Sequence, residues 1–132
     1  MSASLKHPTV DAVLAIHEQV LAAHGGATGI RSRDLLESAV AAPQATKMGA
    51  LLISDPIEIA AAYLFYLCGN HPFVDGNKRA GHAVLETFLM LNGYEISARV
   101  DEQAEIVLGV ASGKIDRHRF TDWLKAHIVE LP

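Results

Sequence analysis

The segment Ile57–Cys68 constrains the fold more than any other part of the chain, because Glu58 is its one charged residue. A stretch that is apolar on nearly every side has no face to present to water, so it predicts a helix buried by other elements. The pair Asp55-Pro56 before it supplies a helix cap and a first-turn proline, and Gly69-Asn70 ends it. The rest of the chain must therefore fold around this helix.

A second buried helix is predicted at about Asn77–Asn92, with Gly93 as its stop signal. It is apolar along most of its length because of Val84, Leu85, Phe88, Leu89 and Leu91. Two central helices should thus flank one short polar loop, residues 71–76.

Four more helices complete the prediction of an all-α fold of about six helices, since no other segment alternates apolar and polar residues as a strand does. Their expected ranges are about Thr9–His24, Arg33–Ala42 (stopped by Pro43), Asp101–Ala111 and Asp116–Val129. Thr9 or Asp11, Ser32, Asp101 and Asp116 are the expected caps. Gln44–Ser54 should be a loop that can hold a short hairpin, and Tyr94–Val100 a short extended connection. We expect one compact domain over residues 1–132, with its core at about 10–125.

Composition narrows the class of protein. Half of the 132 residues are hydrophobic, which suits one core, and the net charge of −4 argues against direct binding of nucleic acid. The single cysteine, Cys68, lies in an apolar run, so we expect a core residue, no internal disulfide and a reducing compartment. There is no apolar signal segment at the start, and the longest apolar run, Ile59–Cys68, is shorter than the ~20 residues that span a bilayer. We expect a cytoplasmic protein with no membrane partner.

Residues 71–79, His-Pro-Phe-Val-Asp-Gly-Asn-Lys-Arg, concentrate the chemistry of the chain. Gly76 lets the backbone approach a ligand closely, and the first N–H groups of the following helix lack intrahelical acceptors. These donors, from Gly76 to Arg79, form an anion cradle that the helix dipole strengthens. Lys78 and Arg79 add positive charge there. The pattern predicts a phosphate site.

Two further residues suit phosphate chemistry. Asp75 is a carboxylate beside the cradle, and Mg²⁺ is often held by one or two carboxylates together with substrate phosphates. His71 lies at the other end of the loop, where an imidazole can take a proton from an attacking hydroxyl.

Each residue also has a structural interpretation. Asn77 can be a simple helix cap, and Lys78 and Arg79 a solvated helix start; only their joint placement favours a site. Lys78, His82 and Glu86 recur every four residues on one helix face, which must meet either a ligand cleft or an internal salt-bridge network. Four other histidines, His17, His24, His118 and His127, are expected on the surface, and Phe120 and Trp123 should seal the last helix against the core.

The loop resembles the signature of the Fic/Doc superfamily, through His71, Phe73, Asp75, Asn77 and Arg79. Residues Ile30–Ala39 and Leu89–Tyr94 are similar to its death-on-curing (Doc) branch. The resemblance implies a helical domain that uses ATP. The residue matching His71 would activate a protein hydroxyl, the one matching Asp75 would organise Mg²⁺, and those matching Gly76, Asn77 and Arg79 would hold phosphates.

The chain departs from the AMP-transferring Fic pattern, which has glycine where Lys78 stands and a second arginine where His82 stands. The death-on-curing branch shares the lysine, and its best-known member transfers the γ-phosphoryl group of ATP to elongation factor Tu and halts translation. The resemblance therefore implies a toxin that phosphorylates a Ser or Thr of a translation factor, with Lys78 in the phosphate clamp. A cognate antitoxin should be its partner, because members of this branch are silenced by a separate antitoxin and the chain has no good match to the self-inhibitory Ser/Thr-x-x-x-Glu helix motif. AMP transfer and a non-catalytic nucleotide- or partner-binding module remain as alternatives.

The segment Gln44–Ser54 has two interpretations. It takes the place of the target-positioning flap of Fic-like folds, where Lys47 and Met48 can touch a substrate, or it is an ordinary surface loop.

Overall fold

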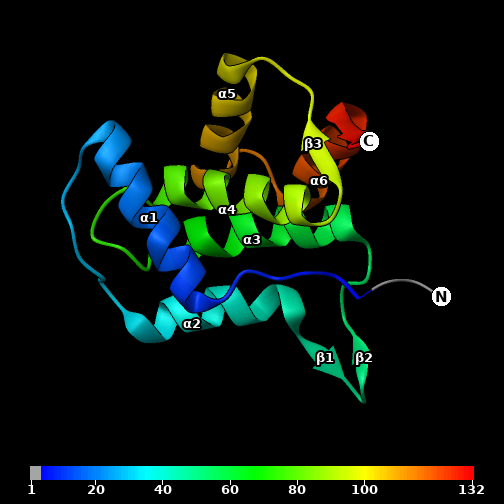
Figure 1. The fold of residues 1–132 in the computed structure, drawn as a ribbon, viewed down its shortest axis with the longest axis horizontal. Coiled ribbons are helices and arrows are strands. Elements are labelled where there is room, and N and C mark those ends of the chain that lie inside the picture. Colours follow the sequence, from blue (N-terminus) through cyan, green and yellow to red (C-terminus); the bar gives the residue numbers. More distant parts are fainter. Residues whose placement is uncertain (1–3) are drawn as a thin grey trace.

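The structure is a computed structural model that describes residues 4–132. It confirms the all-α prediction of about six helices, with two small antiparallel strand pairs added (Figure 1). The helices are α1 (Val10–His24), α2 (Arg33–Ala41), α3 (Pro56–Asn70), α4 (Asn77–Leu91), α5 (Val100–Ala111) and α6 (Arg117–His127), and a 3₁₀ turn, Ala42–Gln44, follows α2. The strands are β1 (Thr46–Lys47), β2 (Ala50–Leu51), β3 (Tyr94–Ile96) and β4 (Ile128–Glu130).

The two apolar helices predicted from the sequence form the centre of the molecule. Figure 1 shows α3 and α4 lying side by side, joined by the loop of residues 71–76 at one end. Tyr63 and Leu64 of α3 and Phe88 of α4 are completely buried. Gly81 permits the close approach, because a Cβ at that position would lie 3.0 Å from Leu64 Cδ1.

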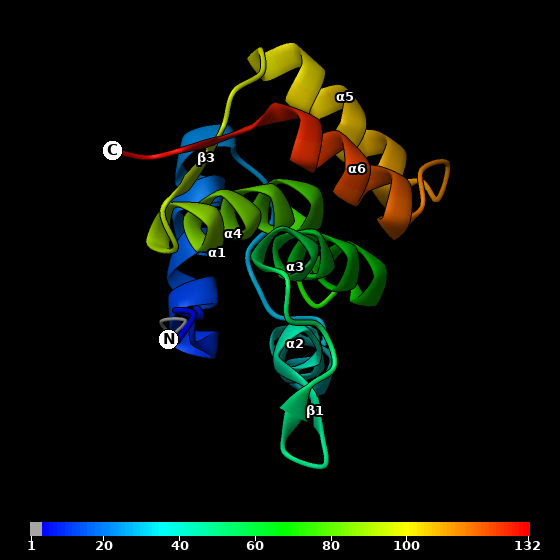
Figure 2. The ribbon, with the colours of Figure 1, turned by 90° about the vertical axis from the view of Figure 1, so that its right-hand side faces the viewer.

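The other helices surround this pair. α1 packs on α4, while α2 and α6 pack on α3 from different sides (Figure 2). α5 contacts both central helices. Phe120 is buried and Trp123 packs partly buried against the core, as predicted for the seal of α6.

Four predicted caps are confirmed and one is wrong. The side chains of Thr9, Ser32, Asp55 and Asp116 each accept a hydrogen bond from the first turn of their helix. α5, however, begins at Val100, so Asp101 lies inside its first turn and not at the cap. There its carboxylate accepts a hydrogen bond from the N–H of Glu102, and its negative charge interacts favourably with the helix dipole.

The last helix is shorter than predicted. α6 ends at His127, and Ile128–Glu130 continues as β4, antiparallel to β3. The register pairs Ile128 with Ile96, which lies within the predicted extended connection. A partner strand from another part of the chain supplies these backbone bonds, so the local helical pattern did not reveal the change.

The short hairpin predicted within Gln44–Ser54 is present as β1 and β2. It projects from the body at the end of α3 opposite the loop of residues 71–76 (Figures 1 and 2). Met48 at its tip is 99% exposed. α3 has 15 residues, so at 1.5 Å per residue about 22 Å separates the hairpin end of this helix from His71.

Within residues 4–132, no helix combines the length and the apolar character that crossing a membrane requires.

Candidate active site

The loop between α3 and α4 is braced from behind by the connection between α1 and α2. The carbonyl of Pro72 accepts from the N–H groups of Arg31 (2.7 Å) and Ser32 (3.1 Å), and Val74 donates to the carbonyl of Gly29 (3.0 Å). Ile30 and Phe73 form an isolated antiparallel bridge. The loop is therefore anchored by backbone bonds to a distant part of the chain.

His71 closes α3 in an unusual backbone conformation. Its φ of 49° lies in the left-handed region, which costs free energy for a residue other than glycine. The guanidinium of Arg31 stabilises it by donating to the carbonyls of His71 (2.6 Å) and Asn70 (2.7 Å). Sequence reasoning assigned no role to Arg31, since its partners lie 40 and 39 residues away.

Asn77 is the internal brace of the loop and is only 6% exposed. Its Oδ1 accepts from the N–H of Phe73 (3.0 Å), and its Nδ2 donates to the carbonyl of Phe73 (3.0 Å). Nδ2 also lies 3.0 Å from Nδ1 of His71. The interpretation of Asn77 as a simple helix cap is wrong, because Gly76 is the N-cap of α4.

His17 is buried, so the expectation that it lies on the surface was wrong. Its ring stacks on Phe73 with centroids 3.7 Å apart, and its Nε2 donates to the carbonyl of Asp75 (2.8 Å). The signal that could have revealed it is spacing: Val13, His17 and Val20 are the buried residues of α1, four and three positions apart. His24 and His118 are exposed as expected, while His127 is partly buried against Trp123.

Gly76 begins α4 with a left-handed φ of 78°. Its own N–H donates to Oδ1 of Asp75 (2.9 Å), so this donor of the predicted anion cradle is already engaged. The next three N–H groups, of Asn77, Lys78 and Arg79, have no recorded acceptor within residues 4–132. These three are the donors that the start of the helix offers to an anion.

Asp75 is a charged carboxylate at the edge of this helix start. Hydrogen bonds from the backbone N–H groups of Ala27 and Gly76 hold the pKa of Asp75 below its ordinary value, and the bond from Ala27 has the larger effect. Each carboxylate oxygen accepts one of these bonds and keeps a free lone pair. Gly26 makes this contact possible, because a Cβ there would lie 2.8 Å from Oδ2 of Asp75.

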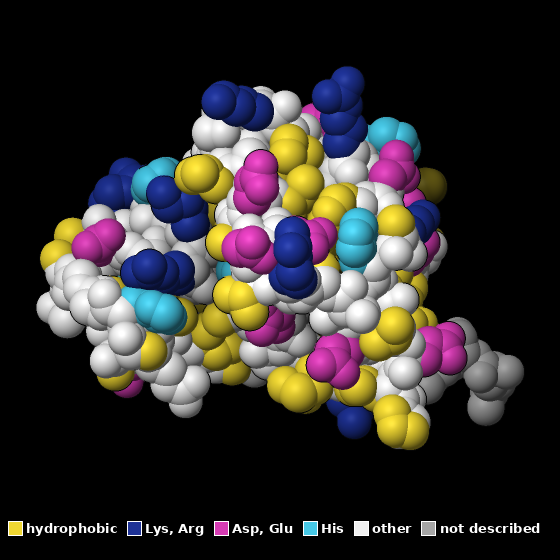
Figure 3. Space-filling view, turned by 90° about the horizontal axis from the view of Figure 1, so that it is seen from above, with side chains coloured by type: hydrophobic (Ala, Val, Ile, Leu, Met, Phe, Trp, Pro, Cys, Tyr) yellow, Lys and Arg dark blue, Asp and Glu magenta, His cyan; other side chains and the backbone are white. Residues whose placement is uncertain are grey.

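All six predicted site residues line one cleft of about 590 Å³: His71, Asp75, Gly76, Asn77, Lys78 and Arg79. The opposite wall consists of Leu108, Ala111 and Ser112 at the end of α5. This volume lies within the range of small-molecule sites. Seen from above, some lysine, arginine and histidine side chains lie close together toward the left edge of the molecule, and others are scattered over the rest of this face among acidic ones (Figure 3). The cleft can therefore take an anionic ligand with an apolar part.

Cys68 also lines the cleft, but burial raises the pKa of its thiol to about 11, against a smaller lowering by Lys78. The thiol thus stays protonated near neutral pH, which agrees with the predicted core role and not with a nucleophile.

The polar stripe of α4 is divided between two places. Lys78 lines the cleft, whereas His82 and Glu86 line a separate hollow of about 410 Å³. Nε2 of His82 lies 2.8 Å from Glu86 and 3.1 Å from Oε1 of Gln103 on α5. Burial lowers the pKa of His82, but the hydrogen bond and charge of Glu86, with the bond to Gln103, outweigh it and raise the pKa overall.

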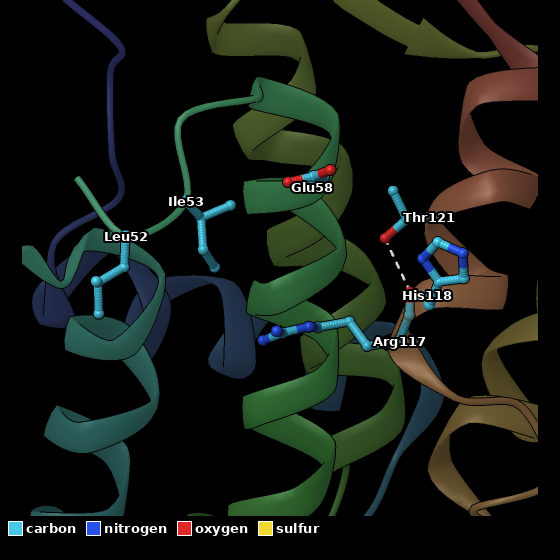
Figure 4. A pocket seen from close by; sticks show the side chains of 6 residues that line it. All are labelled: Leu52, Ile53, Glu58, Arg117, His118 and Thr121. Atoms are coloured by element: carbon cyan, nitrogen blue, oxygen red, sulfur yellow. Dashed lines mark hydrogen bonds between the residues drawn. The ribbon is translucent and has the colours of Figure 1, made fainter.

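A third hollow, of about 290 Å³, lies near the start of α3. Figure 4 shows Arg117 reaching from the start of α6 across α3, with Leu52 and Ile53 on the other side. The guanidinium lies 5.6 Å from the ring centre of Phe65 and 5.8 Å from that of Tyr66. Arg117 is thus occupied by aromatic partners, which makes this hollow a weaker candidate for an anion.

No group of three or more potential metal-ligating His, Cys, Asp or Glu side chains occurs among residues 4–132. Among residues 4–132, Asp75 is the one carboxylate that lines the cleft. A metal there would need ligands from a substrate, as Mg²⁺ commonly uses, so the residues fit Mg²⁺ bound together with phosphates.

The sequence model of the Fic/DOC family matches residues 7–89. This match covers more than half of the chain, and the chain therefore belongs to the Fic/DOC family.

Two similar proteins indicate to which branch of this family the chain belongs. The protein named Toxin Doc from Mycolicibacterium smegmatis is 41% identical over 96 residues, which cover 71% of this chain and 74% of that protein. The protein named Protein kinase doc from Escherichia phage P1 is 27% identical over 121 residues, covering 92% and 94%. These similarities place the chain in the death-on-curing branch, as the sequence predicted.

A solved structure of Fic-1 from C. elegans (residues 134–508, E274G) has the same fold, with a TM-score of 0.70 and 24% identity. The match covers 92% of this chain but 41% of the Fic-1 chain, so it bears on the fold alone.

Proposed function

We propose that this protein is the toxin of a toxin–antitoxin pair and transfers the γ-phosphoryl group of ATP to a Ser or Thr hydroxyl of a translation factor. One observation carries the proposal: His71 lines the same cleft as the open N-terminus of α4, with Lys78 and Arg79 beside it. A proton acceptor and an anion cradle within one cleft are what attack of a hydroxyl on phosphorus requires.

Each residue has a defined task in this reaction. The N–H groups at the start of α4, with Lys78 and Arg79, bind the phosphates of ATP. Asp75 would hold Mg²⁺, which supplies charge neutralisation at the phosphates when bound. The hydroxyl oxygen bonds to the γ-phosphorus, the bond from that phosphorus to the bridging oxygen breaks, ADP leaves, and His71 takes the hydroxyl proton and releases it to water.

Three observations favour phosphoryl over AMP transfer. Lys78 lines the cleft where AMP-transferring enzymes carry glycine, and His82 lines a different hollow instead of supplying a second arginine-like clamp. The relative from phage P1 is also named a protein kinase. AMP transfer remains the second candidate, because the same histidine and cradle serve attack on the α-phosphorus.

Incubation with a translation factor and ATP labelled separately at the α and γ positions decides between them. We expect transfer of the γ label alone. Transfer of the α label alone would replace the kinase proposal with AMP transfer. If neither label is transferred to any of a set of translation factors, the proposed substrate class is wrong.

The variant His71→Ala tests whether the protein is an enzyme at all. Loss of the base should lower the transfer rate by roughly 10²–10⁴-fold and abolish growth arrest, while the exposed side chain leaves folding intact. His24→Ala, also exposed but outside the cleft, is the matched control. Growth arrest by a folded His71→Ala protein would favour the non-catalytic binding module. Co-expression of the wild-type protein with the cognate antitoxin should suppress both label transfer and growth arrest.

A further inference from the structure

The two ring nitrogens of His71 are in different situations. Nδ1 lies 3.0 Å from Nδ2 of Asn77, and an amide nitrogen can only donate. Nδ1 must therefore be the unprotonated acceptor, which places the single proton of the neutral ring on Nε2. In the absence of ligand the second ring nitrogen of His71, a residue that lines the cleft, is thus a donor.

The orientation of the Asn77 amide is fixed by its surroundings. Oδ1 faces the N–H of Phe73 and Nδ2 faces the carbonyl of Phe73, each at 3.0 Å. Rotating the amide by 180° would place Nδ2 against the N–H of Phe73, donor against donor, and Oδ1 against the carbonyl of Phe73, acceptor against acceptor. Since Asn77 is 6% exposed, water cannot compensate for these losses. The assignment of the His71 proton therefore rests on two independent hydrogen bonds.

This tautomer cannot do what the proposed function asks of His71. A general base needs a lone pair on the nitrogen that meets the hydroxyl. Nδ1 is covered by Asn77, and Nε2, which has no recorded partner within residues 4–132, already carries a proton. The ring must exchange its tautomer before it can accept a proton at Nε2.

We propose that Asn77 is a positioning residue that holds His71 in the Nε2–H tautomer until a nucleotide phosphate replaces His71 as the acceptor of one Nδ2–H of Asn77. Asn77 lines the cleft at the start of α4, so a phosphate oxygen bound there competes with His71 for Nδ2–H. Once this bond is lost, Nε2 releases its proton to water and Nδ1 takes one from water, with no net change in charge. The base is then competent only when nucleotide is present. This inference rests on the proposed function.

Nitrogen NMR of the ¹⁵N-histidine-labelled protein tests it directly. Without nucleotide, at a pH where the ring is neutral, His71 should show a pyridine-like Nδ1 and a pyrrole-like Nε2. With Mg²⁺ and a non-hydrolysable ATP analogue, the two signals should exchange character. Exposed His24 provides the reference for a ring outside the site. A pyrrole-like Nδ1 in the free protein, a tautomer mixture like that of His24, or an unchanged tautomer after the analogue binds would each overturn the proposal.

Asn77→Asp is the complementary variant, because its carboxylate accepts from Nδ1–H. It should show a pyrrole-like Nδ1 without any nucleotide. A folded variant that keeps the pyridine-like Nδ1 would contradict the proposal that residue 77 sets the tautomer of His71. If the variant does not fold because Asp faces the Phe73 carbonyl, the wild-type spectra still decide the matter. Failure of the proposed function appears separately, as absence of label transfer, and leaves the tautomer of the free protein untouched.

Discussion

His71 is held by two residues that act on different parts of it. Arg31 binds its carbonyl and so stabilises the left-handed backbone, while Asn77 contacts its ring. Neither contact is a salt bridge or an apolar contact, and both are hydrogen bonds whose loss leaves an oriented group without its partner. Single-residue changes at these positions should therefore alter the site more than the core.

Arg31→Lys should lower both stability and turnover. Lysine carries its three N–H donors on one nitrogen, so it cannot reproduce the planar fork in which Nε and Nη2 of Arg31 donate to the carbonyls of His71 and Asn70. We expect the free energy of unfolding to fall by about 1–2 kcal/mol and kcat to fall with little change in the KM for ATP. Urea denaturation and steady-state kinetics measure the two effects.

Arg33→Lys is the matched control, because Arg33 forms an exposed pair with Glu37, and such pairs contribute little. Equal losses in the two variants would show that Arg31 has no special role at His71.

At the scale of whole elements, α3 and α5 set the walls around the site, and each carries a glycine in a different environment. A Cβ at Gly69 in α3 would meet nothing within 4 Å. A Cβ at Gly109 in α5 would lie 2.4 Å from Cδ1 of Ile115 and 2.9 Å from its Cγ1. The same substitution should therefore have opposite effects in the two helices.

Gly69→Ala should raise the free energy of unfolding by up to about 1 kcal/mol, because alanine favours the helix. Gly109→Ala should lower it by about 1–3 kcal/mol through overpacking against Ile115. It should also weaken nucleotide binding, since Leu108 and Ala111 beside it line the cleft. Urea denaturation of both variants provides the comparison, and a stabilising Gly109→Ala would mean that Ile115 moves aside freely.

The contact between α4 and α5 should make stability depend on pH through His82. Its folded-state pKa is raised above the ordinary 6.5, so the fold favours the protonated ring. This contribution is fully present below pH 6.5 and is lost as pH rises through the folded-state pKa. The difference in free energy of unfolding between wild type and His82→Gln should therefore shrink as pH rises above 6.5.

Glu86→Gln supplies the control for His82, because the hydrogen bond and charge of Glu86 are what raise the pKa. This variant should lose most of the pH dependence in the same range. Urea denaturation at a series of pH values measures it, and an unchanged pH profile in either variant would assign the dependence to other groups.

At the scale of the whole molecule, the cleft is assembled from segments that are far apart in the sequence. The loop before α4, the start of α4 and the end of α5 line it, and the connection after α1 holds the loop in place through Ala27 and Arg31. A ligand that binds this assembly and not the unfolded chain stabilises the entire fold by mass action.

Mg²⁺ with ATP should therefore raise the Tm of the protein. At 100 times the Kd of the nucleotide, the stabilisation is about 2.7 kcal/mol. Arg79→Glu should remove most of the Tm shift, because it reverses charge at the anion cradle. Lys47→Glu makes the same charge change on the exposed hairpin and should leave the shift intact. Equal loss in both variants would mean that net charge, and not the cleft, governs binding.

The sequence by itself determined the helices and the position of the loop. Apolar periodicity and capping residues act within a few positions along the chain, so α3, α4 and the caps at Thr9, Ser32, Asp55 and Asp116 were predictable. The placement of six chemically matched residues within the nine-residue segment 71–79, at the loop and the start of α4, likewise predicted which part of the chain would line a cleft.

Only the tertiary structure decided how these residues are held. His17 and Asp75 are 58 positions apart, and Arg31 and His71 are 40 apart, so no local pattern encodes their hydrogen bonds. The pairing of β4 with β3, the burial of His17 and the separation of His82 from the cleft also depend on which elements pack together. Local free energies choose the helices, whereas the contacts that orient the site form only when distant segments of the chain meet.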